Sequence, residues 1–269
     1  MLKPEHFIVA LNAALEAGAA ILEVYKEDFP VKFKKDNSPL TLADKNAHDV
    51  IVKALGPLGY PILSEEGKAI SFEERGVWKE FWLVDPLDGT KEFIKRNGKF
   101  TVNIAFIRDG IAIAGIIYAP VLNKLWFANE ETGSRYIDIS KVHDGIFAWD
   151  TMLSQSVILP LDTNKLSYVV ASSVSHLNEE TREFIDKAVI GKDHVEYLQV
   201  GSSLKFCSLA EGYVDLYPRL GPTMEWDTAA GQAIAELSGC KVVEYLTGNP
   251  LRYNKSSLLN PWFVAGRDI

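Results

Sequence analysis

The stretch Trp82-Leu83-Val84-Asp85-Pro86-Leu87-Asp88-Gly89-Thr90 decides how the rest of the chain is organised. Its apolar half, residues 81–84, is suited to a strand that crosses a core, and it ends abruptly in two carboxylates. Because unpaired buried charges are strongly destabilising, Asp85 and Asp88 require a cationic partner. The stretch therefore predicts a strand that ends at a site for divalent metal ions, with Gly89 and Thr90 placed beside it to meet a phosphate.

The composition is typical of a soluble globular protein with a sizeable core: 269 residues, 47% of them hydrophobic and 24% charged. The 28 Lys and Arg residues against 36 Asp and Glu residues leave a net charge of −8. Nucleic acids and membrane surfaces select proteins with a basic face, so this balance argues against a nucleic-acid partner. An anionic substrate would need local cations, which bound metal ions can supply.

The cysteines and the N-terminal segment bear on the cellular compartment. Cys207 and Cys240 lack the spacing of a metal site, and we expect free thiols in a reducing compartment. Residues 7–24 are apolar enough to mimic a signal peptide, but Glu16 interrupts them and the apolar positions keep helical spacing. We expect a helix of the mature protein, no transmembrane segment and a cytoplasmic location. Peripheral association with the inner membrane and the oligomeric state are left open.

The first half of the chain predicts helices followed by a sheet. Thr41 and Asp44 fit a capping box at the start of a helix. Residues 102–107 and 111–118 have the pattern of two strands joined by the hairpin signal Asp109-Gly110. Further strands at 125–128 and 135–139, together with 81–84, predict a large and mostly antiparallel sheet. Residues 141–155 show no clear period, and we expect surface excursions there.

The second half alternates strands and helices. We expect strands at residues 168–171, 195–200, 214–217 and 241–244, and helices at 178–189, 202–210 and 226–237, the first capped by Asn178. Such alternation indicates layered α/β packing. The sequence shows no repeat and no low-complexity linker, which predicts a single domain, 1–269, with at most a subdomain seam near residues 140–160.

Three acidic groups stand at the ends of apolar segments: Glu65 with Glu66, Asp85 with Asp88, and Asp227. Carboxylates without His or Cys suit hard cations, and Mg²⁺ in particular binds a few carboxylates together with water and substrate phosphate. The carbonyl of Leu87 is free to coordinate as well. The alternative is that these residues form plain solvated turns, as Asp-Pro and Asp-Gly often do.

Two segments have the character of phosphate sites. Gly89-Thr90 precedes a short helix at 91–95, and Gly201-Ser202-Ser203 lies between a strand and a helix, where free backbone N–H groups favour anions. The alternative for the second segment is simple N-capping by Ser202. Lys205 and Arg219 are candidate phosphate clamps, or else solvated surface charges.

These motifs together resemble the inositol monophosphatase superfamily of Mg²⁺-dependent, lithium-sensitive phosphatases. The resemblance is carried by residues 82–90, by Glu65 upstream, and by Glu225-Trp226-Asp227-Thr228-Ala229-Ala230-Gly231 downstream. The segments 91–98, 100–105, 201–207 and 216–219 are similar to the bacterial CysQ branch, the 3'(2'),5'-bisphosphate nucleotidases. The resemblance implies an α+β fold, a layered αβαβα sandwich of the inositol monophosphatase and sugar phosphatase type.

The resemblance also implies a reaction: the hydrolysis of 3'-phosphoadenosine 5'-phosphate to AMP and phosphate, linked to sulfur metabolism. Carried over by position, Asp44 and Thr90 orient and deprotonate the attacking water. Two or three Mg²⁺ ions are bound by Glu65, Asp85, the Leu87 carbonyl, Asp88 and Asp227, with Glu66 secondary. We expect substrate contacts from Gly89, Thr90, Gly201, Ser202, Ser203, Lys205, Arg219 and Asp227.

Two other functions are compatible with the same residues. The protein could hydrolyse inositol or sugar phosphates, because the metal site is shared. It could also be a non-catalytic regulator that binds nucleotide or metal. The presence of both Asp44 and Thr90 disfavours the second, because these residues serve water activation rather than affinity.

Overall fold

The computed structural model describes residues 2–27, 32–33, 39–142, 149–172 and 178–269. The described part contains a seven-stranded sheet, a five-stranded sheet and the short pair β1–β2. Its elements are α1 (Pro4–Tyr25), β1 (Lys32–Phe33), β2 (Pro39–Leu40), α2 (Leu42–Leu55), η1 (Gly56–Leu58), β3 (Ile62–Ser64), α3 (Phe72–Arg75), β4 (Glu80–Asp88), α4 (Thr90–Ile94), β5 (Thr101–Arg108), β6 (Ile111–Ala119), β7 (Lys124–Asn129), β8 (Gly133–Asp138), η2 (Ile139–Lys141), α5 (Trp149–Gln155), β9 (Val157–Ile158), β10 (Tyr168–Ser172), α6 (Glu179–Ala188), β11 (Val195–Gln199), α7 (Leu204–Glu211), β12 (Leu216–Arg219), α8 (Glu225–Glu236), β13 (Lys241–Glu244) and β14 (Phe263–Gly266).

The larger sheet has the order β3-β4-β5-β6-β7-β8-β9. Only β3 and β4 run parallel, and every other neighbouring pair is antiparallel. Asp109 and Gly110, which join β5 to β6, both have positive φ, at 49° and 76°. A two-residue turn with positive φ at both positions matches the twist of a hairpin. The predicted hairpin and the mostly antiparallel sheet are therefore confirmed.

Both faces of the larger sheet are buried, and the alternation along β4 shows how. Trp82 and Val84 pack with α1 and α2 on one face, whereas Phe81 and Leu83 pack with α7 and α8 on the other. The close approach of α8 depends on Gly115 of β6, because a Cβ there would lie 2.3 Å from a backbone oxygen of α8. Two helix layers thus enclose this sheet.

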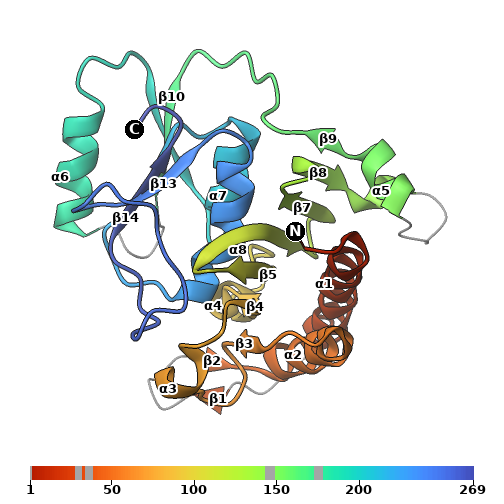
Figure 1. Ribbon diagram of the computed structural model, residues 1–269. Coiled ribbons are helices and arrows are strands. Elements are labelled where there is room, and N and C mark those ends of the chain that lie inside the picture. Colours follow the sequence, from red (N-terminus) through yellow and green to blue (C-terminus); the bar gives the residue numbers. More distant parts are fainter. Residues whose placement is uncertain (1, 28–31, 34–38, 143–148, 173–177) are drawn as a thin grey trace.

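The smaller sheet has the order β11-β10-β12-β14-β13 and supplies the remaining layers. One face packs on α7 and α8 through Phe206 and Phe263, and the other packs on α6 through Ile185. Figure 1 shows the sequence of layers from α1 and α2, through the larger sheet, α7 and α8, and the smaller sheet, to α6. This is the expected αβαβα sandwich.

Two elements, β14 and α5, differ from the local predictions. β14 was not predicted, although it lies between β12 and β13 in the smaller sheet. Its four residues are all buried and show no polar alternation. Helix α5 was expected as a surface excursion, yet its Met152 is buried and its Trp149 stacks edge-on against Phe7. Residues 143–148, also in that excursion, lie outside the described residues.

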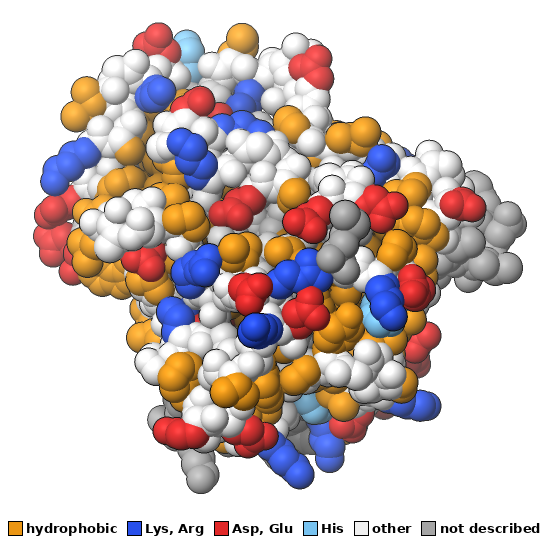
Figure 2. Space-filling view, viewed as in Figure 1, with side chains coloured by type: hydrophobic (Ala, Val, Ile, Leu, Met, Phe, Trp, Pro, Cys, Tyr) orange, Lys and Arg blue, Asp and Glu red, His pale blue; other side chains and the backbone are white. Residues whose placement is uncertain are grey.

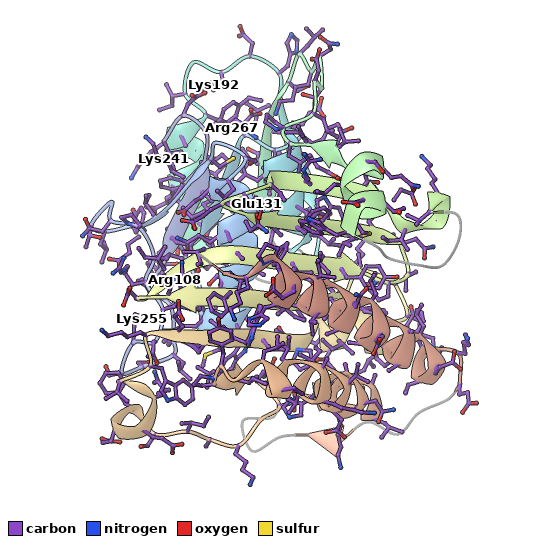
Figure 3. The ribbon with its side chains drawn as sticks, turned by 45° about the vertical axis from the view of Figure 1, so that its right-hand side comes forward. Arg108, Glu131, Lys192, Lys241, Lys255 and Arg267 are labelled. Carbon is purple, nitrogen blue, oxygen red and sulfur yellow. The ribbon has the colours of Figure 1, made fainter. Side chains whose placement is uncertain are left out.

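Helix α1 bears on the expectation of no transmembrane segment, which stays a prediction. Within the described residues, this 22-residue helix is the one candidate by length and apolar composition. Core helices of soluble proteins and signal sequences satisfy the same criteria. In this fold, nine of its residues, including Phe7 and Ile21, are buried. Figure 3 shows α1 lying beside α2 against the larger sheet.

Candidate active site

The parallel pair β3 and β4 brings two of the predicted acidic groups together. Ser64 pairs with Val84, and the Glu65 N–H donates to the Val84 carbonyl at 3.1 Å. Glu65, which follows β3, and Asp85, which follows Val84 within β4, therefore lie at the same end of this strand pair. Glu66, next along the turn, is half-buried like Glu65.

A bulge interrupts the strand pairing within the segment Asp85-Pro86-Leu87-Asp88. The register between β4 and β5 shifts between Asp85 and Asp88. The Leu87 N–H donates to Asp85 Oδ1 at 3.0 Å, and only 2% of Asp85 is exposed. A bulge can redirect side chains at the end of a strand. After this one, Asp88 pairs again with Thr101 of β5.

Asp227 comes from the distant helix α8. It is the third residue of the helix, and its Oδ2 accepts a hydrogen bond from the Met224 N–H at 2.8 Å. This bond caps the helix and fixes the carboxylate. Asp227 joins the other acidic groups electrostatically, because the charges of Asp88 and Glu65 raise its pKa.

The pKa values of the three aspartates are raised by a shared cause. Desolvation raises the pKa of Asp85 well above its ordinary value, and Glu65, Asp88 and Asp227 raise it further. Desolvation raises the pKa of Asp88 to about 6, with Lys205 opposing, and raises the pKa of Asp227 to about 8. Buried carboxylates that repel one another are stabilised by a cation between them.

The hydrogen bonds test whether the aspartates suit a metal ion. Asp85, Asp88 and Asp227 each have one oxygen held by a backbone N–H. Their other oxygens accept no hydrogen bond in the described part of the chain, which leaves three oriented oxygen ligands. Within that same part, no group of three or more His, Cys, Asp or Glu side chains is placed so that it could hold a metal ion by itself. The donors fit Mg²⁺, which retains water ligands rather than requiring a complete protein cage.

Asp88 is anchored by residues from the start of α7 and from β5. The Ser203 N–H donates to Asp88 Oδ2 at 2.6 Å, and Asn103 Nδ2 donates to the same oxygen at 3.3 Å. Ser203 Oγ donates in turn to Asn103 Oδ1 at 2.8 Å and lies 2.8 Å from Thr101 Oγ1. We did not predict a role for Asn103 or Thr101, although both lie in a segment that carried the family resemblance.

Gly89 and Ser202 form the second connection between these segments. Ser202 Oγ donates to the carbonyls of Asp88 and Lys99, both at 2.9 Å. Gly89 has a φ of 95°, and a Cβ there would lie 2.2 Å from Ser202 Oγ. N-capping of α7 by Ser202 is therefore wrong as an alternative, because the helix begins after Ser203 and has no side-chain cap.

Asp44 and Thr90 meet as expected. Thr90 Oγ1 donates to Asp44 Oδ1 at 3.1 Å, while Asp44 Oδ2 accepts from Thr41 N and Oγ1 at 2.7 and 2.6 Å. The predicted capping box of α2 is confirmed. One carboxylate thus caps a helix and orients the hydroxyl of Thr90, which also lies 3.4 Å from the Leu87 carbonyl.

A cavity of about 160 Å³ adjoins the aspartates and contains both predicted cations. Only 5% of Lys205 is exposed, and its Nζ donates to the carbonyls of Val200 and Ser202. Desolvation lowers the pKa of Lys205 to about 8. Arg219 donates through Nη2 to the Pro222 carbonyl, whereas its buried Nε has no hydrogen-bond partner among the residues that the structure describes. These are not solvated surface charges, and Arg219 retains an unused donor.

The rest of the cavity lining includes residues that we did not predict. With the aspartates and cations, the walls are Asp88, Gly89, Lys91, Glu92, Gly201, Ser202, Ser203, Lys205, Phe206, Tyr217, Arg219, Thr223, Asp227 and Thr228. The structure therefore brings together all the predicted substrate-contact residues except Thr90, which lies beside the cavity with Asp44. Figure 2 shows acidic and basic side chains interspersed across one face of the molecule.

A buried ion pair supports the helix that carries Asp227. Glu225, which is 0% exposed, accepts from Lys255 Nζ at 2.6 Å and from the N–H groups of Asn254 and Lys255. Asn254 also accepts from Arg75 Nη1 at 2.9 Å. Figure 3 shows Lys255 near Arg108, at the end of the larger sheet. The loop before β14 thereby links α3 to the start of α8.

The sequence matches a known family over nearly its whole length. Residues 3–262 match the model described as the inositol monophosphatase family. The chain belongs to this family. A family member from Escherichia coli strain K12, the 3'(2'),5'-bisphosphate nucleotidase CysQ, is 44% identical over 93% of this chain and 95% of its own. The nucleotidase CysQ of Haemophilus influenzae is 34% identical over 98% of this chain and 94% of its own.

Two solved structures share the fold. The crystal structure of CysQ from Bacteroides thetaiotaomicron matches with a TM-score of 0.90 and 43% identity, covering 100% of this chain and 99% of that one. SuhB from Bartonella henselae matches with a TM-score of 0.74 and 22% identity, covering 98% and 94%. The second likeness supports the fold alone.

Proposed function

We propose that the protein is a Mg²⁺-dependent 3'(2'),5'-bisphosphate nucleotidase that hydrolyses 3'-phosphoadenosine 5'-phosphate to AMP and phosphate. The observation that carries this proposal is the cavity, in which oriented aspartate oxygens lie next to two cations of the protein. A substrate with two phosphates can place one phosphate at the aspartates and the other at the two cations. The high identity to CysQ nucleotidases over nearly full length supports the same substrate class.

The acidic residues would hold two or three Mg²⁺ ions. Glu65, Asp85, Asp88 and Asp227 supply carboxylates, and Leu87 supplies its carbonyl, with Glu66 secondary. Magnesium dependence is general in this family. The metal, when bound, lowers the pKa of water and neutralises charge on the phosphoryl oxygens. The protein contributes fixed positions for these ligands, because backbone N–H groups already hold three of the carboxylates.

Asp44 and Thr90 are proposed to direct the proton of the attacking water. The Asp44 carboxylate accepts the Thr90 hydroxyl proton in a hydrogen bond, so the hydroxyl oxygen is left to accept from water. A positioned acceptor of this kind contributes to general base catalysis. Asp44 is 1% exposed, which protects the pair from competing solvent.

Lys205 and Arg219 are proposed to bind the phosphate that is not transferred. The buried Arg219 Nε has no partner, and a phosphate oxygen would satisfy it. Gly89, Gly201, Ser202, Ser203 and Asp227 line the same cavity and are proposed to contact the substrate. A substrate without a second phosphate would leave both cations unused.

Inositol or sugar phosphate hydrolysis is a second candidate function. It is favoured by one feature: the proposed metal site would contact only the phosphate that is hydrolysed.

We propose further that the chain acts as a single domain in the cytoplasm. Two observations support this proposal: α7 and α8 pack against both sheets, and Cys207 and Cys240 are buried, unpaired thiols.

The decisive variant is Asp85→Asn, because Asp85 is the most buried of the proposed ligands. We expect phosphate release from 3'-phosphoadenosine 5'-phosphate with Mg²⁺ to fall by at least about a hundredfold. The wild-type chain should respond to Mg²⁺ and lose activity when lithium is added. Near-wild-type turnover by Asp85→Asn would refute the metal assignment. Tight nucleotide binding by the wild-type chain with no phosphate released would favour a regulator.

A further inference from the structure

Glu92 is an acidic residue inside the cavity that has no place in the proposed reaction. It lies on α4, and its side chain fits between two glycines. A Cβ added to Gly201 would lie 3.2 Å from Glu92 Cγ, and one added to Gly89 would lie 3.4 Å from Glu92 Oε2. The two glycines therefore leave the space that the half-buried Glu92 side chain occupies.

The carboxylate of Glu92 differs from the other two acids that line the cavity. Asp88 and Asp227 receive hydrogen bonds from backbone N–H groups and are proposed metal ligands. The Glu92 carboxylate accepts no hydrogen bond and makes no ion pair with any residue that the structure describes. It lies near enough to Lys205 to affect that lysine electrostatically. A negative charge there weakens phosphate binding by the cations unless the ligand offers it a donor.

We propose that Glu92 is a specificity-determining residue that accepts a hydrogen bond from a neutral donor on the nucleoside part of the substrate. The donor is either a ribose hydroxyl or an amino group of the base, since both present N–H or O–H to a carboxylate. This inference rests on the proposed function. It explains why an acid belongs in an anion-binding cavity: inorganic phosphate meets repulsion there, whereas a nucleotide gains a charge-assisted hydrogen bond.

Substrate analogues that each lack one donor test the inference. kcat/KM is measured for 3'-phosphoadenosine 5'-phosphate, its 2'-deoxy analogue and its inosine analogue, using wild type, Glu92→Ala and Glu92→Gln. For the wild type, we expect kcat/KM of one analogue to be lower than that of the parent by about tenfold or more. For Glu92→Ala, the kcat/KM values of that analogue and of the parent should lie within about twofold of each other. Glu92→Gln, which keeps an acceptor oxygen, should give an intermediate ratio.

Inhibition by inorganic phosphate is an independent measurement. If Glu92 had only a structural role, its substitution would not make phosphate bind more tightly. Both Glu92 variants should bind phosphate about two- to fivefold more tightly than wild type, because a repulsive charge is gone. The charge-matched control is Glu131→Gln, an exposed glutamate labelled in Figure 3, which should behave as wild type in both measurements. Urea unfolding midpoints establish that each variant is folded.

Three results would overturn the inference. The first is that kcat/KM of the wild type is the same for all three substrates. The second is that the ratio of kcat/KM between analogue and parent is the same in wild type and Glu92→Ala. The third is that phosphate inhibits the variants no more strongly than it inhibits the wild type. If Glu92→Ala does not fold, Glu92→Gln decides through phosphate inhibition. A wild type that turns over the parent bisphosphate but shows any of these results refutes the role of Glu92 alone. A wild type with no turnover of the bisphosphate refutes the proposed function as well.

Discussion

Thr90 and Asp44, which are 46 positions apart in the sequence, share a hydrogen bond of 3.1 Å from Thr90 Oγ1 to Asp44 Oδ1. The other carboxylate oxygen, Oδ2, accepts the N–H and the hydroxyl of Thr41 at the start of α2. The two oxygens of Asp44 therefore have separate partners, one structural and one at the site. Substitutions can separate the two roles.

We predict that Asp44→Asn lowers kcat by about 10²- to 10⁴-fold with little change in KM, because the amide is a poor proton acceptor. Thr41→Ala removes only the capping hydroxyl. It should lower the free energy of unfolding by about 1 kcal/mol and leave kcat within about fivefold of wild type. Phosphate release and urea unfolding measure the two effects. A Thr41→Ala variant as slow as Asp44→Asn would contradict the separation.

Asn103 is predicted to set the affinity for Mg²⁺ through Asp88. Its amide holds Asp88 Oδ2, and Ser203 holds the Asn103 carbonyl in turn. Residues that orient metal ligands typically change affinity by about 10- to 100-fold when removed. Asn103→Ala should raise the Mg²⁺ concentration for half-maximal activity by that factor, and calorimetric Mg²⁺ binding should weaken equally. Unchanged Mg²⁺ affinity together with a reduced kcat would show that Asn103 acts in another way.

The ion pair between the fully buried Glu225 and the half-buried Lys255 should contribute to stability. Lys255→Met keeps the aliphatic length but leaves a fully buried carboxylate with only backbone N–H partners. We expect the free energy of unfolding to fall by about 3 kcal/mol. Lys241→Met, at an exposed lysine, is the control and should change stability by less than about 0.5 kcal/mol. Equal effects from both variants would contradict this account.

Glu211 predicts a pH dependence of stability away from the metal site. It is 7% exposed, accepts from Trp126 Nε1 at 3.0 Å, and burial raises its pKa above the ordinary 4.5. Its contribution is therefore fully present below that unfolded value and is lost as pH rises through the folded pKa. Glu211→Gln keeps the acceptor and does not titrate.

The measurement is the urea midpoint of wild type and Glu211→Gln between about pH 4 and pH 8. The variant's advantage over wild type should grow as pH rises above 4.5 and level off above the raised folded pKa of Glu211. A difference between the two proteins that stays constant across this range, or that shrinks with rising pH, would show that Glu211 is not the group responsible.

Local patterns in the sequence predicted the elements whose cause is local. The capping box at Thr41, the cap at Asn178 and the turn at Asp109-Gly110 each depend on residues within a few positions, and all three were confirmed. β14 was missed because its four buried residues carry no alternation. Helix α5 was missed because it packs against Phe7 of α1, which is distant in the sequence.

The residues of the site likewise include some that the sequence predicted and some that it did not. The acidic groups were identifiable because carboxylates that end apolar segments are unusual and because the motifs resemble a family. The anchor of Asp88 was not, since Ser203 and Asn103 are 100 positions apart and neither residue type signals a metal site. Glu92 escaped prediction because a glutamate in the first turn of a helix is ordinary. Its environment distinguishes it only when Gly89 and Gly201 are brought around it.

The central claim is that the cavity binds a substrate with two phosphates, one at the aspartates and one at Lys205 and Arg219. The most direct measurement compares kcat/KM for 3'-phosphoadenosine 5'-phosphate and inositol monophosphate, with Mg²⁺ and the same wild-type preparation. Two cation–phosphate contacts predict a preference of at least about a hundredfold for the bisphosphate. Equal values, or a preference for inositol monophosphate, would contradict the account.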